Sequence, residues 1–581
     1  MRVVHSFGSL NAGKNIKEDA SFILTNKIGG YCLLAGSPSS RYQGVFFNDH
    51  FKMYKAIEDI RVIGCEVSKV KELKNNFFNV ERKRNSITES FFMPYGFDSF
   101  VYELSKEGNV ELVLDIRETY SNPEFGRSYD IFEENGKIIV KYRQENEFEC
   151  YLVVSGYSSY EKTQNWLMRN YDADRQRNSP PYSKYVFSAL KIRSKKLVFS
   201  FSFDKEKAIK ENTFVFDNLE KLKCKQEMDI RKIINRNNGV LGKIKNNETK
   251  IAYICALISL NNMAVNINGI DGIFAGLPWF FQFWERDEAI TLKALSCVGK
   301  REAVRNILAR LVGSIKGNKA ANKYPEGDLY SSDAAGWILH RVNKLEKGLL
   351  KSREAENILK NLDDNLVFNG KKETWMDSID RDGARIEMQA LKLAMLKSNK
   401  GMENKFRNKV RESFWNNKFL RDGIYDETIR PNIFIAAYLY PELLSKEEWL
   451  QCFEYAIERL WLEWGGLSTI DKNNHLFYGK HTGENPKSYH NGDSWFYLNN
   501  LAALVLYRAD KKKFGRYIKK ILDASTNEIL WKGAIGHHAE ISSASVLSSE
   551  GCLSQAWSSA MFIELIDELK FKKNLNTRII S

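Results

Sequence analysis

The sequence predicts a multidomain α+β protein in which a β-sandwich precedes a helical domain. Up to about residue 220, apolar residues alternate with period two between turn signals, whereas beyond about residue 245 they follow helical spacing. A polar break from Asn235 to Gly239 separates these two patterns. Since 581 residues exceed one ordinary core, we predict a β-domain at 1–220, a helical linker at 221–245 and a helical domain at 246–581.

Hairpin signals support the β-domain. Asn135-Gly136 lies inside an alternating segment, residues 128–142, and these two residue types supply the positive φ angles of a tight turn. Gly108-Asn109 separates two further apolar segments and predicts a second hairpin. Residues 197–203 alternate between apolar and largely hydroxyl side chains, which is typical of a strand. Several such strands at short intervals favour a sandwich.

Helical spacing dominates the rest of the chain. Residues 205–235 are charged and predict a helix, and helical spacing of apolar residues continues at 251–258 and 304–311. Further helices are predicted at 387–398, 403–415, 446–461, 494–508 and 554–570. Ordinary helix and loop lengths leave room for about a dozen helices, a number that fits a toroid of paired helices.

The segment from Gly276 to Asp287 combines aromatic residues with an Arg286-Asp287 pair at the start of a predicted helix. Aromatic faces pack on the C–H face of a sugar ring, and a carboxylate and a guanidinium bind its hydroxyls. The alternative is that the aromatics belong to the core and the charged pair is solvated. The loops between the later helices are rich in Gly, Trp, Asp and His, and a toroid would bring them to one end.

Composition excludes several classes of protein. With 43% hydrophobic and 28% charged residues, the chain has the composition of a soluble globular protein. It has no apolar run of about eighteen residues and no secretory signal at Met1, so we expect a cytoplasmic protein without a membrane partner. The eight cysteines are scattered singly, and no ligand spacing predicts a metal site. The net charge of +14 is interleaved with acidic residues, which favours a solvated surface over a nucleic-acid groove.

Motifs in a fixed order run along nearly the whole chain, and together they resemble one family: the amylo-α-1,6-glucosidase type of glycogen-debranching enzyme. These motifs are Thr25-Asn26 with Gly29-Gly30-Tyr31, Arg41-Tyr42-Gln43-Gly44, Pro278-Trp279, Arg286-Asp287, Ser332-Asp333-Ala334, Thr374-Trp375-Met376-Asp377, Glu387 with Ala390-Leu391, Arg430-Pro431-Asn432, Tyr489-His490-Asn491-Gly492 with Trp495, and Gln555-Ala556-Trp557-Ser558.

This resemblance implies an N-terminal antiparallel β-supersandwich followed by a C-terminal (α/α)6 barrel. It also implies hydrolysis of the single glucose left on an α-1,6 branch, with inversion at the anomeric carbon. The implied partner is an α-glucan such as glycogen, limit dextrin or a branched maltooligosaccharide, and no cofactor is implied. Gln43, where the family usually has His, is one of several departures that bear on chain-length preference more than on the reaction.

By the same resemblance, Asp377 is the general acid and Glu540 the general base. Inverting hydrolysis needs two such carboxyl groups about 6.5–9.5 Å apart. We expect Trp375 and Met376 to desolvate Asp377 and raise its pKa, and Glu540 to be open to water and ionised. The predicted substrate-binding residues are Trp279, Trp284, Arg286, Asp287, Asp333, Trp375, Glu387, His490, Trp495 and Trp557.

Alternatives remain open at each level. Asp377 would be a helix N-cap if a helix began at Ser378, and Glu550 competes with Glu540 for the base. Asp380, Glu387 and Asp493 are reserve candidates for either carboxyl role. At the level of function, the rivals are a glucoamylase-like or trehalase-like exo-acting hydrolase on the same fold, and a catalytically inactive glucan-binding protein.

Overall fold

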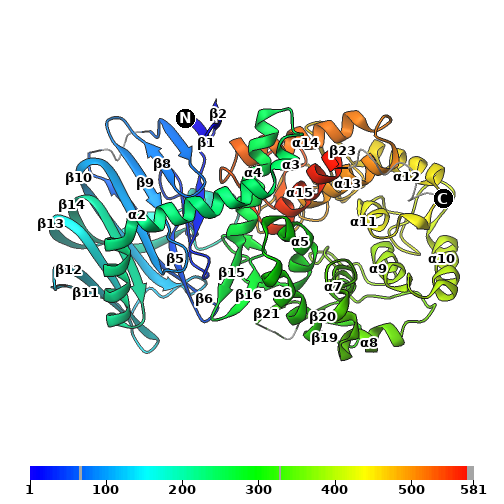
Figure 1. Ribbon diagram of the computed structural model, residues 1–581, viewed down its shortest axis with the longest axis horizontal. Helices are drawn as coiled ribbons and strands as arrows, with labels where there is room; N and C mark the ends of the chain where they lie inside the picture. Colours follow the sequence, from blue (N-terminus) through cyan, green and yellow to red (C-terminus); the bar gives the residue numbers. More distant parts are fainter. Residues whose placement is uncertain (65–68, 326, 328, 572–581) are drawn as a thin grey trace. The chain divides into compact units, whose positions relative to one another are not determined.

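The computed structural model describes residues 1–64, 69–325, 327 and 329–571, which form two compact units (Figure 1). The first unit comprises Met1–Asn235, Asn262–Ile270 and Leu530–His537. The second comprises Arg236–Asn261, Asp271–Ile529 and the segment from His538 onward. Each unit therefore draws on segments that are far apart in the sequence.

The described residues of the first unit are built on a sheet of fourteen strands. They are β1 (Arg2–Phe7), β2 (Leu10–Asn15), β3 (Phe22–Thr25), β4 (Tyr31–Leu34), β5 (Gly44–Asp49), β6 (Lys52–Val62), β7 (Glu72–Asn75), β8 (Val80–Lys83), β9 (Thr88–Phe92), β10 (Ser99–Glu118), β11 (Arg127–Glu134), β12 (Lys137–Gln144), β13 (Phe148–Asn170) and β14 (Ser183–Ser202). The sheet forks at β10, because its first half pairs with β9 and its second half with β6.

One predicted hairpin is confirmed and the other is wrong. Asn135 and Gly136, at φ 51° and 70°, turn the chain between β11 and β12. Gly108-Asn109 instead lies inside the continuous strand β10, where the pairing with β14 shifts register between Glu103 and Gly108. The extra residues of a bulge, and not a turn, explain the glycine there. The alternating segment 197–203 forms the end of β14, as predicted.

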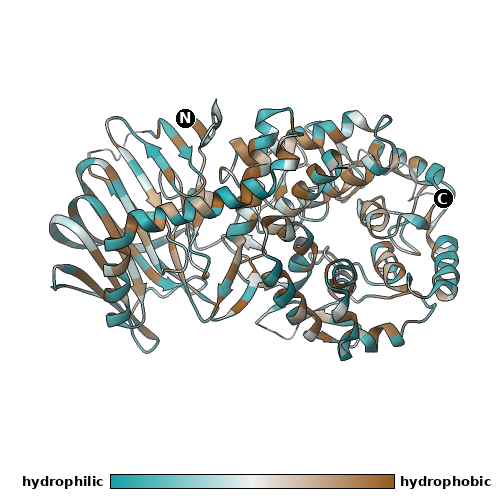
Figure 2. Ribbon diagram, in the orientation of Figure 1, coloured by the Kyte–Doolittle hydropathy of each residue, from teal (hydrophilic) through white to brown (hydrophobic). Residues whose placement is uncertain are grey.

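The charged segment 205–235 forms one long helix, α2 (Lys205–Arg236), which alternates polar and apolar residues along its length (Figure 2). Its apolar side packs on the sheet through Val215 and Leu219, which contact Val101 and Val198. Asn212 is fully buried and donates from Nδ2 to the carbonyl oxygens of two strands. The helix thus crosses the predicted boundary at residue 220: its first half covers the sheet, and its second half lies in the segment predicted as a helical linker.

Six helices of the second unit follow one another around a closed ring, and the last contacts the first (Figure 1). They are α5 (Glu285–Val298), α7 (Ser332–Leu345), α9 (Ile386–Leu396), α11 (Asn432–Leu439), α13 (Phe496–Asp510) and α15 (Ala556–Phe571). The other α-helices of this part are α4 (Asn247–Met263), α6 (Arg301–Gly313), α8 (Arg353–Lys360), α10 (Lys400–Phe414), α12 (Lys446–Leu460) and α14 (Gly515–Trp531).

These helices agree with the sequence prediction. The described residues after 246 contain twelve α-helices, and the five predicted between residues 387 and 570 begin and end within a few residues of the observed bounds. No described helix is both long and apolar enough to cross a membrane. Five of the seven described cysteines are buried, and Cys65 lies outside the described residues.

Short elements complete the two units. The helical ones are α1 (Asp172–Gln176), α3 (Asn238–Leu241), η1 (Lys347–Lys351) and η2 (Pro441–Leu443). The strands are β15 (Ala264–Ile267), β16 (Ile270–Ile273), β17 (Gly276–Leu277), β18 (Phe283–Trp284), β19 (Ile315–Lys316), β20 (Lys319–Ala321), β21 (Lys323–Tyr324), β22 (Tyr330–Ser331), β23 (Trp461–Leu462), β24 (Gly466–Leu467), β25 (Ser494–Trp495), β26 (Ile541–Ser542) and β27 (Ser554–Gln555).

Candidate active site

The Arg286-Asp287 pair lies in the first turn of α5, where both side chains are buried. Arg286 donates from Nε to Asp333 Oδ1 at 2.9 Å and from Nη2 to Ser331 Oγ at 3.1 Å. Asp333 lies in the first turn of α7, so the ion pair ties the starts of two neighbouring ring helices together. The alternative of a solvated pair is therefore wrong.

Asp377 lies next to this ion pair. Its Oδ2 is 4.0 Å from Arg286 Nη1, and the backbone N–H of Trp375 donates to Asp333 Oδ2 at 2.8 Å. Desolvation raises the pKa of Asp377, as expected from its neighbours, while Arg286 opposes that rise. The N-cap alternative is wrong, because the next helix in the chain, α9, begins only at Ile386.

Glu540 is buried, with 1% of its surface exposed, so the expectation that it is open to water is wrong. The Tyr489 hydroxyl donates to Glu540 Oε1, and the backbone N–H of Cys552 donates to Oε2 at 2.9 Å. Burial raises the pKa of Glu540 to about 7, although both hydrogen bonds act in the opposite direction. The carboxyl group is thus poised to titrate near neutral pH.

Asp287 links the acidic groups electrostatically. Burial, together with the charges of Glu540, Asp377 and Asp333, raises its pKa to about 8, although Arg286 acts in the opposite direction. Gln555 Nε2 donates to Asp287 Oδ1 at 3.2 Å. Residues from α5, α7 and two distant loops therefore share one electrostatic neighbourhood.

Aromatic rings gather beside these carboxyl groups. Trp375 packs edge-on against His490 and Trp495, with ring centroids 5.3 and 5.4 Å apart, and His490 stacks on Trp495 at 5.1 Å. Tyr497 stacks on Trp557 at 4.3 Å. Within the described chain, the buried Tyr497 hydroxyl and Trp557 Nε1 make no protein hydrogen bond. Such groups are suited to the hydroxyls of a sugar.

Burial and the nearby Arg430, Arg381 and Arg286 hold the pKa of His490 well below its usual range. The ring is therefore neutral near pH 7. Its Nδ1 is 2.6 Å from Ser378 Oγ, one residue beyond Asp377. His490 thus contacts the predicted acid loop by an edge-on ring contact with Trp375 and by a hydrogen bond with Ser378.

Two other predicted residues, Glu387 and Trp284, are engaged with protein partners. Glu387 is buried and both of its oxygens accept from Arg381, at 2.8 and 3.3 Å, which leaves it a structural partner and not a group free for substrate. Trp284 precedes α5 and packs edge-on against Phe280 at 5.7 Å. Trp279 lies in the same segment, and the place of both tryptophans in a sugar pocket stays a prediction.

The reserve carboxylates have other partners. Asp380 pairs with Lys371 at 2.9 Å, with 53% of its side chain exposed. Asp493 is buried and pairs with His481 Nδ1 at 2.7 Å. The backbone of Glu550 pairs with Ile541, just beyond Glu540. Asp380 and Asp493 are thus engaged in ion pairs, and the assignment of Asp377 as acid and Glu540 as base stays a prediction.

Sequence reasoning missed Tyr489, Tyr497 and Gln555 as contributors to this site. Tyr489 directly precedes His490, and Gln555 lies two positions before Trp557, so the place of these two residues in motifs was the available signal. Tyr497 stands in neither motif and had no such signal. From the sequence alone, a tyrosine or glutamine among aromatic residues can equally be a packed core side chain. Only the fold shows which group its polar atom contacts.

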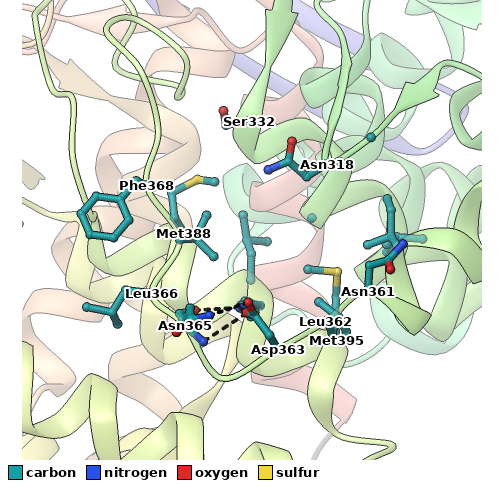
Figure 3. A pocket seen from close by; sticks show the side chains of 18 of the residues that line it. Asn318, Ser332, Asn361, Leu362, Asp363, Asn365, Leu366, Phe368, Met388 and Met395 are labelled. Atoms are coloured by element: carbon teal, nitrogen blue, oxygen red, sulfur yellow. Dashed lines mark hydrogen bonds and ion pairs between the residues drawn. The ribbon is translucent and has the colours of Figure 1, made fainter.

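A separate cavity of about 460 Å³ lies between α7, α8 and α9 (Figure 3). Leu339, Met388 and Met395 contribute apolar lining, and Lys392 at its edge binds Asp363 and Asn365. None of the predicted site residues lines it. Within the described ranges, no three His, Cys, Asp or Glu side chains are grouped as a metal site requires.

Comparison with known proteins agrees with this architecture. The bacterial glucoamylase complexed with acarbose superimposes with a TM-score of 0.64 at 12% identity and covers 98% of each chain. A glycosidase variant in complex with glucose matches with a TM-score of 0.42 at 13% identity, over 56% of this chain and 99% of its own.

No curated protein sequence matches the chain. The sequence pattern of amylo-alpha-1,6-glucosidase matches residues 258–564, more than half of the chain and all of the candidate site. The protein therefore belongs to the amylo-alpha-1,6-glucosidase family of glycoside hydrolases.

Proposed function

We propose that the protein is an inverting glycoside hydrolase that releases glucose from α-1,6 branch stubs of glycogen or a related α-glucan. The observation that carries this proposal is the carboxyl pair Asp377 and Glu540, from loops far apart in the sequence, which lies with Arg286 and Asp287 in one electrostatic neighbourhood beside a cluster of aromatic rings. Membership of the family supports the same substrate class.

In this mechanism Asp377 donates its proton to the glycosidic oxygen as the bond to the anomeric carbon breaks. Glu540 removes a proton from the water that attacks the opposite face of the sugar, so the product is β-glucose. The raised pKa of Asp377 keeps a fraction of it protonated at higher pH than an ordinary aspartate. Arg286, Asp287 and the aromatic cluster would bind and orient the terminal glucose.

The proposal also includes the fold of each unit: a β-supersandwich for the first and an (α/α)6 barrel for the second. The closed ring of α5, α7, α9, α11, α13 and α15 supports an (α/α)6 barrel, with the remaining helices as its outer layer. The forked sheet of the first unit supports a β-supersandwich. Since the loops that carry Asp377 and Glu540 both belong to the second unit, the proposed chemistry is confined to that unit.

The test is product analysis on phosphorylase limit dextrin, with starch, maltose and trehalose as competing substrates. We expect free glucose from limit dextrin, appearing first as the β anomer by NMR. Asp377→Asn and Glu540→Gln should each lower kcat by about 10²- to 10⁴-fold, the usual contribution of a general acid or base.

Asp380→Asn is the matched control, because that carboxylate is in the same loop but exposed and paired with Lys371. It should retain near wild-type kcat. Faster hydrolysis of starch or trehalose than of limit dextrin would point to a glucoamylase-like or trehalase-like enzyme. Binding of limit dextrin without any release of glucose would identify an inactive glucan-binding protein.

A further inference from the structure

The loop that carries Asp377 has no helix or strand to hold it, since residues 374–379 form turns and bends. In an irregular segment the side-chain hydrogen bonds decide where each residue points. The three residues before Asp377 are all bound to one buried group of polar side chains. The position of the proposed acid therefore depends on that group.

Asn432, the first residue of α11, contacts two of these three residues. Its Oδ1 accepts from Trp375 Nε1 at 2.8 Å, and its Nδ2 is 3.4 Å from Met376 Sδ. The same Nδ2 donates to Asp422 Oδ1 at 2.7 Å. Asn432 is fully buried, so no water replaces these bonds when the amide is removed.

Arg381 contacts the third residue and completes the group. It donates from Nη1 to Thr374 Oγ1 at 3.2 Å, and from Nε and Nη2 to both oxygens of Asp422, at 2.8 to 3.0 Å. Arg381 is 3% and Asp422 2% exposed on the side chain. A buried ion pair adds little stability relative to apolar packing, but its geometry is well defined when every donor is used.

We propose that Asn432, held by Asp422 and Arg381, is a positioning residue that aims the Asp377 carboxyl group at the glycosidic oxygen. The inference rests on the proposed function, since it gives Asp377 the role of proton donor. Asn432 does not touch the reacting atoms; it acts through Trp375 and Met376. A displacement of about 1 Å at a reacting group is enough to cost about 10²-fold in rate.

Two substrates with different leaving groups distinguish a misplaced general acid from a general disturbance of the active site. A glucan leaves as an alcohol and needs a proton from Asp377. With α-glucosyl fluoride the carbon–fluorine bond breaks to give fluoride ion, which needs no proton, while Glu540 still takes a proton from the attacking water. The products are glucose, fluoride and a proton. A misplaced acid therefore slows glucan hydrolysis selectively.

The experiment compares kcat for limit dextrin and for α-glucosyl fluoride in Asn432→Leu, a substitution that keeps the branched skeleton of the side chain and removes both polar atoms. We expect a loss of about 10- to 100-fold on limit dextrin, against less than about threefold on the fluoride. Asn212→Leu is the matched control, because Asn212 is an equally buried, hydrogen-bonded amide in the sheet unit. This control should lower the melting temperature but change kcat on limit dextrin and on α-glucosyl fluoride by the same factor.

Thr374→Val tests the same group through a milder, nearly isosteric change, and serves if Asn432→Leu does not fold. Equal losses on both substrates, or no loss on either, in a folded variant would overturn the positioning role. Asp377→Asn is measured alongside: if it too loses both substrates equally, the acid assignment itself fails. If Asp377→Asn loses activity on limit dextrin but keeps it on α-glucosyl fluoride, while Asn432→Leu and Thr374→Val show no such difference, only the positioning role fails.

Discussion

Glu540 combines burial with two hydrogen-bond donors. Burial disfavours the carboxylate, while the Tyr489 hydroxyl and the Cys552 N–H favour the ionised form, and the balance raises the pKa of Glu540 to about 7. A general base works best when its pKa lies near the operating pH. The balance between a dry environment and these donors therefore sets the pH range over which the proposed base is available.

Tyr489→Phe should move that range. Loss of the hydroxyl removes a donor that stabilises the carboxylate, so the pKa of Glu540 rises, by roughly one unit for a hydrogen bond to a charged group. Because the base must be ionised, the acid limb of kcat/KM should shift to higher pH by the same amount. The measurement is a pH–rate profile on limit dextrin from pH 4 to 9.

Tyr253→Phe is the control for this profile. Tyr253 is also buried and donates to a carboxylate, Asp567, at 2.7 Å, but it joins α4 to α15 and not the proposed site. We expect its acid limb to match the wild type. An unmoved limb in Tyr489→Phe, with the same melting temperature, would show that this hydroxyl does not tune the base.

For single residues, the sequence predicted spatial proximity more accurately than it predicted burial and hydrogen-bond partners. Arg286, Asp333 and Asp377 stand in motifs, so their convergence could be inferred by resemblance. The burial of Glu540 could not, because it depends on Tyr489 and on the backbone at Cys552, which no local pattern connects to it. The pairing of Glu387 with Arg381 was hidden for the same reason.

The turn that follows Glu540 is the element that holds it. Glu540 and Cys552 exchange backbone and side-chain hydrogen bonds, and Ile541 pairs with Glu550 in both directions. Gly551 lies inside this turn at φ +66°, and an added Cβ would stand 2.4 Å from Glu540 Oε2. Only a residue without a side chain leaves the carboxyl group where it is.

Gly551→Ala should therefore lower kcat on limit dextrin by about 10²-fold, since the new methyl group displaces the carboxyl group. Gly96→Ala is matched to it: Gly96 has φ +85° but nothing within 4 Å of an added Cβ. Both variants carry the backbone strain of an L-residue in the left-handed region, about 1–2 kcal/mol. Comparable melting temperatures with equal activity in the two variants would contradict the displacement of Glu540.

Elements with a local signal were the predictable ones. The turn at Asn135-Gly136 follows from the φ angles of two adjacent residues, and α9, α10, α12, α13 and α15 follow from periodicity over ten or more positions. Gly108-Asn109 has the same local signal as a turn, yet β14 continues past it as a partner strand and makes it part of a bulged strand. Pairing between distant segments overrides local propensity there.

At the scale of the whole molecule, neither compact unit is one continuous stretch of chain. The sheet unit takes in Asn262–Ile270 and Leu530–His537, which the sequence places among helices. The hydroxyls of Thr25 and Tyr95 donate to Asn262, at 3.0 and 2.7 Å. Such pairings close the sheet unit through residues 167 and 237 positions away, which no periodicity in a single window reveals.

The segment Leu530–His537 continues β-type pairing with the start of the chain. Ser21 donates to the carbonyl oxygen of Gly533 and accepts from the N–H of Ile535, both at 2.9 Å. His5 Nε2 lies 2.9 Å from the Leu530 carbonyl oxygen, and its ring packs edge-on against Trp531 at 5.4 Å. The edge of the sheet at β3 is thus completed by residues far along the chain, and the same segment covers His5 of β1.

A fragment of residues 1–235 should therefore fold incompletely. It lacks these partners, and each buried hydrogen bond contributes about 1 kcal/mol, so the edge at β3 and the neighbourhood of His5 lose several kcal/mol of local stability. Hydrogen exchange measured on the fragment and the full chain should show fast exchange at Ser21 and along β3 in the fragment alone. The β11–β12 hairpin, whose partners all lie within the fragment, should stay protected in both and serves as the internal reference. Equal protection of β3 in the fragment and the full chain would show instead that the first 235 residues specify the sheet unit without the two distant segments.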